Sequence, residues 1–201
     1  MRFLVIVTSC FIFGCTRGGA DAHLEKARHF AFGEQSDLAI AEYRLALDAV
    51  QSNASPEADA IRSKALRGIA DLVYLELRDY RRAVDTYREL ITKFPDAPET
   101  MGARIHLATI FRRQFGDRRA AIAELTSALS RNPPTADELA YQIASMYFEL
   151  QDYAQCALES EGVVRRFDKS EIIDDALLLR AQALAMIDGR KSEAERSLKE
   201  F

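Results

Sequence analysis

The chain has 201 residues, of which 48% are hydrophobic, 27 are basic and 31 are acidic. The formal net charge of -4 excludes the basic excess that is typical of nucleic-acid-binding domains. Nine glycines, five prolines and no tryptophan provide few of the turns that a β-sandwich needs. The composition therefore predicts a mostly helical protein with a packed core.

The first residues have the features of an export signal. Arg2 is followed by a short run, Phe3 to Phe13, which is apolar apart from Thr8, Ser9 and Cys10. A membrane-spanning helix needs about 20 apolar residues, so this run is too short to span a bilayer. A basic start, a short apolar centre and a small residue at the exit predict a secretory signal peptide over residues 1–14.

The exit, Ile12-Phe13-Gly14-Cys15, resembles the bacterial lipobox, whose cysteine takes a lipid. The resemblance implies that Cys15 is the lipidated first residue of the mature chain and that residues 15–21 form a tether. Cys10 is an alternative because Val7-Thr8-Ser9-Cys10 fits the residue classes of the lipobox. With Cys10 as the lipidated residue, the apolar core of the signal would be only Phe3 to Val7. A plain signal or an uncleaved anchor is the third possibility.

The residue after the cysteine bears on localisation. The residue that follows Cys15 is Thr16 and not an aspartate. A lipoprotein without this aspartate resembles those sorted to the outer membrane of Gram-negative bacteria. We therefore expect the periplasmic face of the outer membrane, with inner-membrane anchoring or a soluble periplasmic protein as alternatives.

Cysteine usage is consistent with export. Removal of Cys10 and acylation of Cys15 leave Cys156 alone, so no intramolecular disulfide can form. An unpaired thiol in an oxidising compartment is tolerated when it is buried. Cys156 lies at an apolar helical position and is predicted to be a small core residue.

A helical motif recurs through the rest of the chain, with a small residue at its centre. These residues are Ala39, Ala83, Ala121, Cys156 and Ala194. A second helical stretch precedes each copy, and in three of them a small residue is followed three positions later by a larger one: Ala108 by Phe111, Ala144 by Tyr147 and Ala181 by Leu184. Each unit therefore reads as helix, tight turn, helix. The third and fifth units carry one extra residue.

Two segments resemble the tetratricopeptide repeat family. They are Ile143-Ala144-x-x-Tyr147 with Asp152-Tyr153, and Ala83-x-x-x-Tyr87 with Pro95. The resemblance implies an all-α, right-handed superhelical solenoid of about five antiparallel helix pairs over residues 22–201. The pattern predicts helices at 22–33, 36–51, 56–78, 80–93, 98–115, 118–131, 135–150, 153–166, 170–187 and 192–201. Thr135 with Glu138, and Ser192 with Glu195, have the spacing of capping boxes.

No arrangement of catalytic or metal-binding residues stands out. His23, His29 and His106 lack the spacing of a metal site, and neither a phosphate-binding glycine loop nor a nucleophile elbow occurs. Asp174 and Asp175 fit the start of a helix, where they complement its positive end. The sequence predicts no enzyme, no cofactor and no metal.

The resemblance implies a concave groove lined by the first helix of each pair. The candidate residues of this groove are Leu75, Glu76, Arg112, Arg113, Tyr141, Phe148 and Glu149. Tyr141 and Phe148 could anchor a peptide, and either arginine could bind a carboxylate. The alternative for each candidate is an ordinary surface or core role.

The last helix forms a second candidate surface. Leu198 and Phe201 lack the polar capping helix that solenoids need for solubility. Contact with another protein, self-association through this helix, and a chain shortened relative to its relatives all account for this.

These features lead to one functional expectation. The chain is expected to be a lipid-tethered, non-enzymatic scaffold or adaptor that binds envelope proteins or peptides and no nucleic acid. A periplasmic chaperone-like carrier of unfolded or transiting polypeptides is the alternative. Outer-membrane β-barrel assembly, Tol–Pal coordination and secretin piloting are the pathways that the resemblance leaves open.

Overall fold

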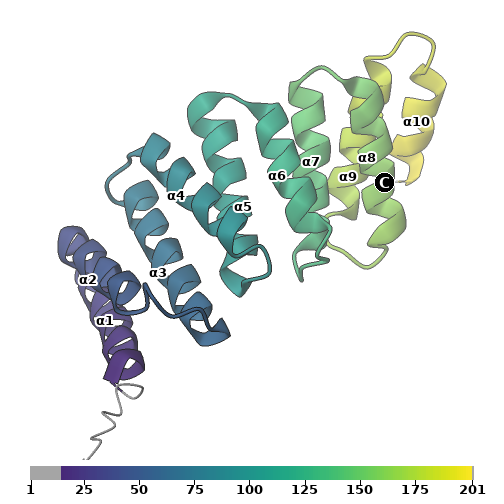
Figure 1. The fold of residues 1–201 in the computed structure, drawn as a ribbon. Helices are drawn as coiled ribbons and strands as arrows, with labels where there is room; N and C mark the ends of the chain where they lie inside the picture. The colour runs from purple at the N-terminus through teal and green to yellow at the C-terminus, as the bar shows by residue number, and fades with distance from the viewer. Residues whose placement is uncertain (1–14, 201) are drawn as a thin grey trace, which may run out of the picture. The chain divides into compact units, whose positions relative to one another are not determined.

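The computed structural model describes residues 15–200, and within that range every regular element is helical (Figure 1). The all-α prediction is confirmed. The helices are α1 (Cys15–Phe32), α2 (Ser36–Ala49), α3 (Pro56–Leu75), α4 (Tyr80–Lys93), α5 (Pro98–Ile110), η1 (Phe111–Phe115), α6 (Arg118–Leu129), α7 (Ala136–Glu149), α8 (Tyr153–Arg166), α9 (Ile173–Ala185) and α10 (Lys191–Glu200). The predicted signal peptide, Cys10 and Phe201 lie outside the described residues.

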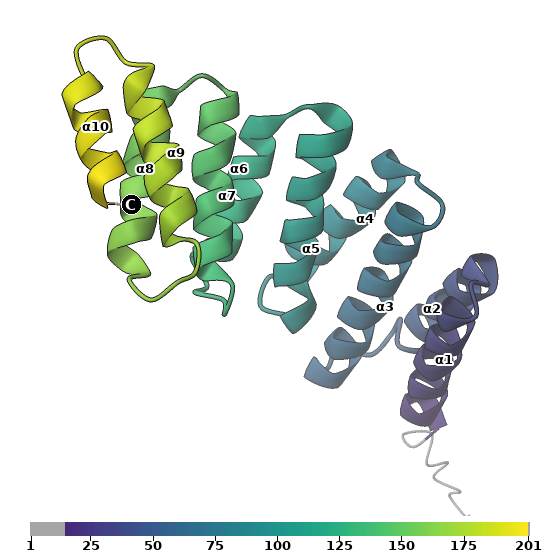
Figure 2. The ribbon, with the colours of Figure 1, turned by 180° about the vertical axis from the view of Figure 1, so that it is seen from behind.

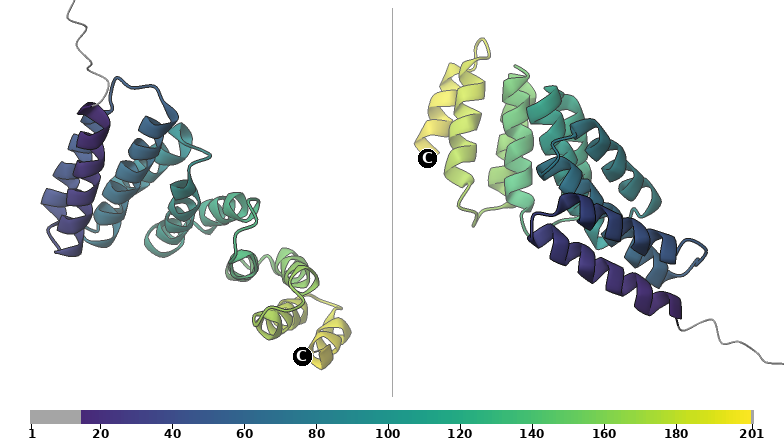
Figure 3. Two further views of the ribbon diagram at one scale, coloured as in Figure 1. Left: turned by 90° about the horizontal axis from the view of Figure 1, so that it is seen from below. Right: turned by 90° about the vertical axis from the view of Figure 1, so that its left-hand side faces the viewer.

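The helices are arranged as consecutive pairs in two compact units. Unit 1 extends to Ala103 and contains α1 to α4 and the first part of α5. Unit 2 starts at Arg104 and contains the rest of α5 and the helices that follow. Within the units, α1 packs on α2, α3 on α4, α7 on α8 and α9 on α10 (Figures 1 and 2). In the left panel of Figure 3 the helices of unit 2 are seen nearly along their axes.

Aspartate side chains cap three of the second helices, and a serine caps one first helix. Asp79, Asp117 and Asp152 each accept a hydrogen bond from the backbone N–H three residues later, and Ser55 does the same for α3. These side chains satisfy backbone donors that have no partner in the first turn of a helix. The two predicted capping boxes are wrong. Thr135 makes no side-chain cap, and Ser192 lies inside α10, which begins at Lys191.

The first helix begins earlier than predicted. The sequence predicts a start at residue 22, after the expected tether over residues 15–21. The helix instead begins at Cys15, so the predicted tether over 15–21 is helical. Ala20 is fully buried, and tertiary packing of this kind supports helical turns that intrinsic propensity does not.

The extra residue of the third unit lies in a turn of π-helix. The helix predicted over residues 98–115 is α-helical to Ile110 and continues as η1 from Phe111 to Phe115. A π turn takes one more residue than an α turn, which absorbs a single insertion without ending the helix. Gly116, with φ of 67°, then stops it in the left-handed conformation that glycine adopts without strain.

The small residues at the centre of the motif form the core, as predicted. Ala39, Ala83, Ala121, Cys156 and Ala194 are all buried. In unit 2, Ala144 of α7 and Cys156 of α8 share one apolar cluster with Leu179 and Ala183 of α9. Small side chains allow the helix axes to approach, and larger neighbours fill the remaining space.

A network of polar side chains fixes α3 against α4 in unit 1. The guanidinium Nε of Arg67 lies 2.7 and 2.8 Å from the two carboxylate oxygens of Asp71. The hydroxyl of Tyr87, a fully buried residue, donates to Asp71 Oδ1 at 2.5 Å. Burial and the neighbouring carboxylate raise the pKa of Tyr87 far above its ordinary value. Each polar group of this network therefore has a partner, as buried polar groups require.

One glycine makes room for an aromatic ring in the same unit. A Cβ atom at Gly68 would lie 2.3 Å from Cζ of the Tyr43 ring, far closer than atoms can approach. Burial raises the pKa of Tyr43. The absence of a side chain at Gly68 therefore lets α2 and α3 pack through the Tyr43 ring.

Candidate protein-binding surfaces

A cluster of charges joins three elements of unit 2. Glu149, the last residue of α7, accepts hydrogen bonds from Arg112 of η1 and from Arg118 at the start of α6. The Arg118 Nε to Glu149 Oε2 distance is 2.6 Å. Burial alone would raise the pKa of Glu149, but the two guanidinium groups outweigh it and lower that pKa. The structure thus brings together two predicted groove residues, Arg112 and Glu149.

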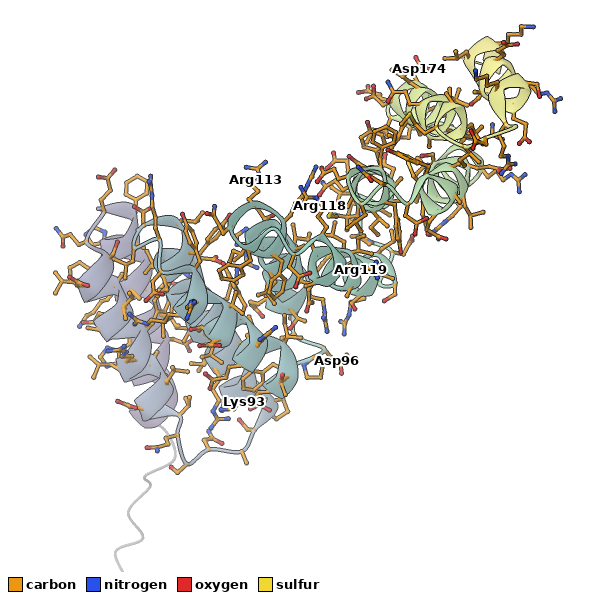
Figure 4. All side chains as sticks on the ribbon, turned by 90° about the horizontal axis from the view of Figure 1, so that it is seen from above. Lys93, Asp96, Arg113, Arg118, Arg119 and Asp174 are labelled. Atoms are coloured by element: carbon orange, nitrogen blue, oxygen red, sulfur yellow. The ribbon has the colours of Figure 1, made fainter. Side chains whose placement is uncertain are left out.

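This pairing changes what Arg112 can do. A partner's carboxylate would have to compete with Glu149 for its guanidinium group. Arg113, the next residue, is exposed, and Figure 4 shows its side chain extending outward from the ribbon. Arg113 is therefore the better placed of the two predicted arginines for contact with an acidic partner.

The two predicted aromatic anchors are only partly exposed. Tyr141 and Phe148 pack against the cluster that contains Ala144 and Cys156. The Phe148 ring meets that of Tyr153 edge to face, with 5.3 Å between centroids. Burial is also the main cause of the raised pKa of Tyr141. Both side chains support the core and leave part of their surface available.

The remaining groove candidates belong to unit 1. Leu75 is the last residue of α3, and Glu76 follows it as the C-cap. Leu75 is 54% exposed, and Leu77 nearby is also exposed. Sequence reasoning missed Leu77, although its position in the turn after α3 was a usable signal.

An apolar groove lies between α9 and α10. It has a volume of about 360 Å³. It is lined by Leu178, Ala181, Gln182, Ala185, Lys191, Ala194, Glu195 and Leu198. The structure places the predicted contact residue Leu198 here, 51% exposed. Ala181 and Ala194 were not predicted as a surface, because they are small residues of the repeated motif and indicated core packing.

The described residues 15–200 contain neither a candidate metal site nor a candidate membrane span. Within them, no group of three or more histidine, cysteine, aspartate or glutamate side chains is arranged to hold a metal ion. No helix in this part of the chain combines the length and the apolar character needed to cross a bilayer.

Comparison with known proteins finds a match to one repeat family in part of the chain. A tetratricopeptide repeat model matches residues 65–97. Comparison with curated protein sequences gives no match.

Solved structures share the fold at low sequence identity. The MamA protein is 15% identical, with a TM-score of 0.62 over 90% of this chain and 89% of that one. A tetratricopeptide repeat protein from Parabacteroides merdae is 18% identical, with a TM-score of 0.65 over 91% of this chain and 65% of that one. The putative kinesin light chain tetratricopeptide-like repeats of Podosopora anserina are 15% identical, with a TM-score of 0.57 over 92% and 93%.

These findings define a protein built from repeated helix pairs. The chain has a tetratricopeptide-like fold, and residues 65–97 match the family model of one such repeat. Solenoids of stacked helix pairs form extended surfaces that other proteins can bind.

Proposed function

We propose that the chain is a non-enzymatic scaffold of the bacterial cell envelope, held at the membrane by a lipid on Cys15. The observation that carries the scaffold function is the tetratricopeptide fold itself, which exposes apolar and charged side chains on paired helices. The lipid and the location are supported by the apolar run and the lipobox-like residues that precede α1. Tethering near a membrane would raise the effective concentration of bound partners.

Photo-crosslinking in cells tests the scaffold. The full-length chain carries a photo-crosslinking amino acid at Arg113 or at Phe148, and captured proteins are identified and quantified. A scaffold yields a short list of partners in fixed proportion to the chain. A broad set of unfolded or transiting polypeptides with rapid exchange would instead establish the carrier function, and capture no greater than at Arg81, an exposed residue of α4, would overturn binding at these positions.

Labelling with palmitate tests the tether. Cells that express the unchanged chain should incorporate the label, and Cys15→Ser should abolish it while Cys10→Ser should not. Labelling that continues in Cys15→Ser but stops in Cys10→Ser would move the anchor to Cys10. An unlabelled parent chain would overturn the tether and leave the scaffold untouched.

A further inference from the structure

The repeat itself shows what kind of surface covers a helix pair. In unit 2, α9 covers the pair formed by α7 and α8. Its Leu179 and Ala183 pack with Ala144 and Cys156 in one buried cluster. Ala176, one helical turn earlier, joins Ala140 and Val163 in a second. The covering helix therefore presents a small, a large and a small residue along one face.

The pair formed by α9 and α10 has a surface equivalent, in the repeat, to the surface of α7 and α8 that α9 covers. Aligned on the repeat, Ala181 corresponds to Ala144 and Ala194 to Cys156. Ala185 and Leu198 likewise correspond to Phe148 and Ser160. These four residues line the apolar groove between α9 and α10. Among the described residues, no helix packs on this groove, and α10 lies at the edge of unit 2 (Figures 1 and 2).

The first helix of a second copy does not suit the groove. The repeat aligns Ala22, Glu25 and His29 of α1 with Ala176, Leu179 and Ala183, the residues through which α9 packs. Ala22, Glu25 and His29 are exposed, and Glu25 pairs with Arg28. Docking α1 there would bury a carboxylate and an imidazole against alanine and leucine, which costs free energy.

The charges beside the α9–α10 groove differ from those beside the equivalent surface of α7 and α8, on which α9 packs. Arg180 of α9 pairs with Glu161 of α8, with 3.7 Å between the charged atoms. The repeat places Lys199 of α10 where α8 has Glu161. A helix that docks as α9 does would therefore need an acidic residue at the position of Arg180.

We propose that the groove between α9 and α10 binds an amphipathic α-helix of a partner protein. The helix carries a small residue, a leucine and a small residue at positions i, i+3 and i+7, and an aspartate or glutamate at i+4. This inference rests on the proposed scaffold function and names the class of its partner. It does not depend on the lipid.

A peptide with the sequence of residues 172–187 and the change Arg180→Glu provides the probe. Its binding to the purified full-length chain is followed by fluorescence anisotropy. Leu198→Glu should weaken binding about tenfold or more, because the leucine contact is lost and a carboxylate enters the apolar groove. The matched control is Leu158→Glu on α8, where the leucine is 61% exposed and lies outside the groove. This control should bind the peptide as the parent does.

Charge reversal tests the register of the docked helix. Lys199→Glu should weaken binding of the Arg180→Glu peptide and strengthen binding of the unchanged peptide. The proposal would be overturned if Leu198→Glu and Leu158→Glu weakened binding equally. It would also be overturned if the Lys199→Glu chain still preferred the Arg180→Glu peptide over the unchanged peptide. A dimer of the parent chain in sedimentation that Leu198→Glu dissociates would overturn it as well, since the occupant would then be a second copy. If these tests fail while crosslinks at Phe148 persist, the scaffold function stands and only the groove's occupant is wrong.

Discussion

Removal of one hydroxyl group tests the polar network of unit 1. In Tyr87→Phe the ring remains, so the packing of α3 on α4 is kept and no cavity forms. The hydrogen bond from the Tyr87 hydroxyl to Asp71 Oδ1, 2.5 Å long, is lost. Asp71 keeps Arg67, whose Nε contacts both carboxylate oxygens.

The size of the effect follows from the charge on the acceptor. A hydrogen bond to a charged group contributes about 1.5–3 kcal/mol, against roughly 1 kcal/mol between neutral groups. Because Asp71 retains a partner, we expect Tyr87→Phe to lower the free energy of unfolding by about 2 kcal/mol. Urea denaturation followed by circular dichroism measures this as a lower midpoint with an unchanged slope.

The matched control is Tyr80→Phe. Tyr80 begins α4, is half-buried and packs its ring against that of Tyr74, with 6.2 Å between centroids. Phenylalanine keeps that contact, so the free energy of unfolding should change by less than about 0.5 kcal/mol. An equal loss in the two variants would refute a special contribution from the Tyr87 hydrogen bond.

Three further predictions concern charge, space and reactivity. Glu149 has a lowered pKa, so its ion pairs stabilise the fold above its ordinary value of about 4.3 and lose this effect as the pH falls through the lowered pKa. Glu149→Gln should therefore lower the free energy of unfolding by about 0.5–1 kcal/mol in urea denaturation at neutral pH. A loss of the same size at a pH below the lowered pKa of Glu149 would contradict the contribution of the ion pairs. Gly68→Ala should lower the free energy of unfolding by about 1–3 kcal/mol, since the new methyl group overlaps the Tyr43 ring; an unchanged urea midpoint would show that the ring moves freely. The Cys156 thiol is buried, and desolvation raises its pKa to about 11. In a chain whose other two cysteines are serine, a thiol reagent should label it only as fast as the protein unfolds, and labelling at the rate of a free thiol would refute the buried position.

Much of the fold could be predicted because the signals are local and repeated. A small residue such as Ala83 or Cys156 recurs at the same place in each motif, and the helical period around it fixes which face is buried. Aspartates such as Asp152 mark the helix starts by capping them. The insertion before Gly116 was visible as one extra residue. Its accommodation as a π turn was not, because that depends on packing around Phe111 that spacing alone does not specify.

The candidate surfaces could be predicted only in part. Sequence reasoning selected Arg112 and Glu149 separately, but not their ion pair, since the residues lie far apart along the chain and on different elements. The groove of unit 2 was missed for another reason. An alanine such as Ala181 or Ala194 gives the same sequence signal whether or not another helix packs on its face. Only the three-dimensional structure shows which face has no helix packed on it. A binding role for Leu75 and Glu76 stays a prediction.

The polar outer face of α1 has a consequence for the size of any assembly. Open-ended filaments arise when two different faces of a molecule complement each other and the contact repeats without closing. Glu25 and His29 give α1 no apolar match for the α9–α10 groove, so one docking event does not create a site for the next. Growth by this contact should stop at a complex of fixed stoichiometry, which protects the protein from polymerisation even at high local density.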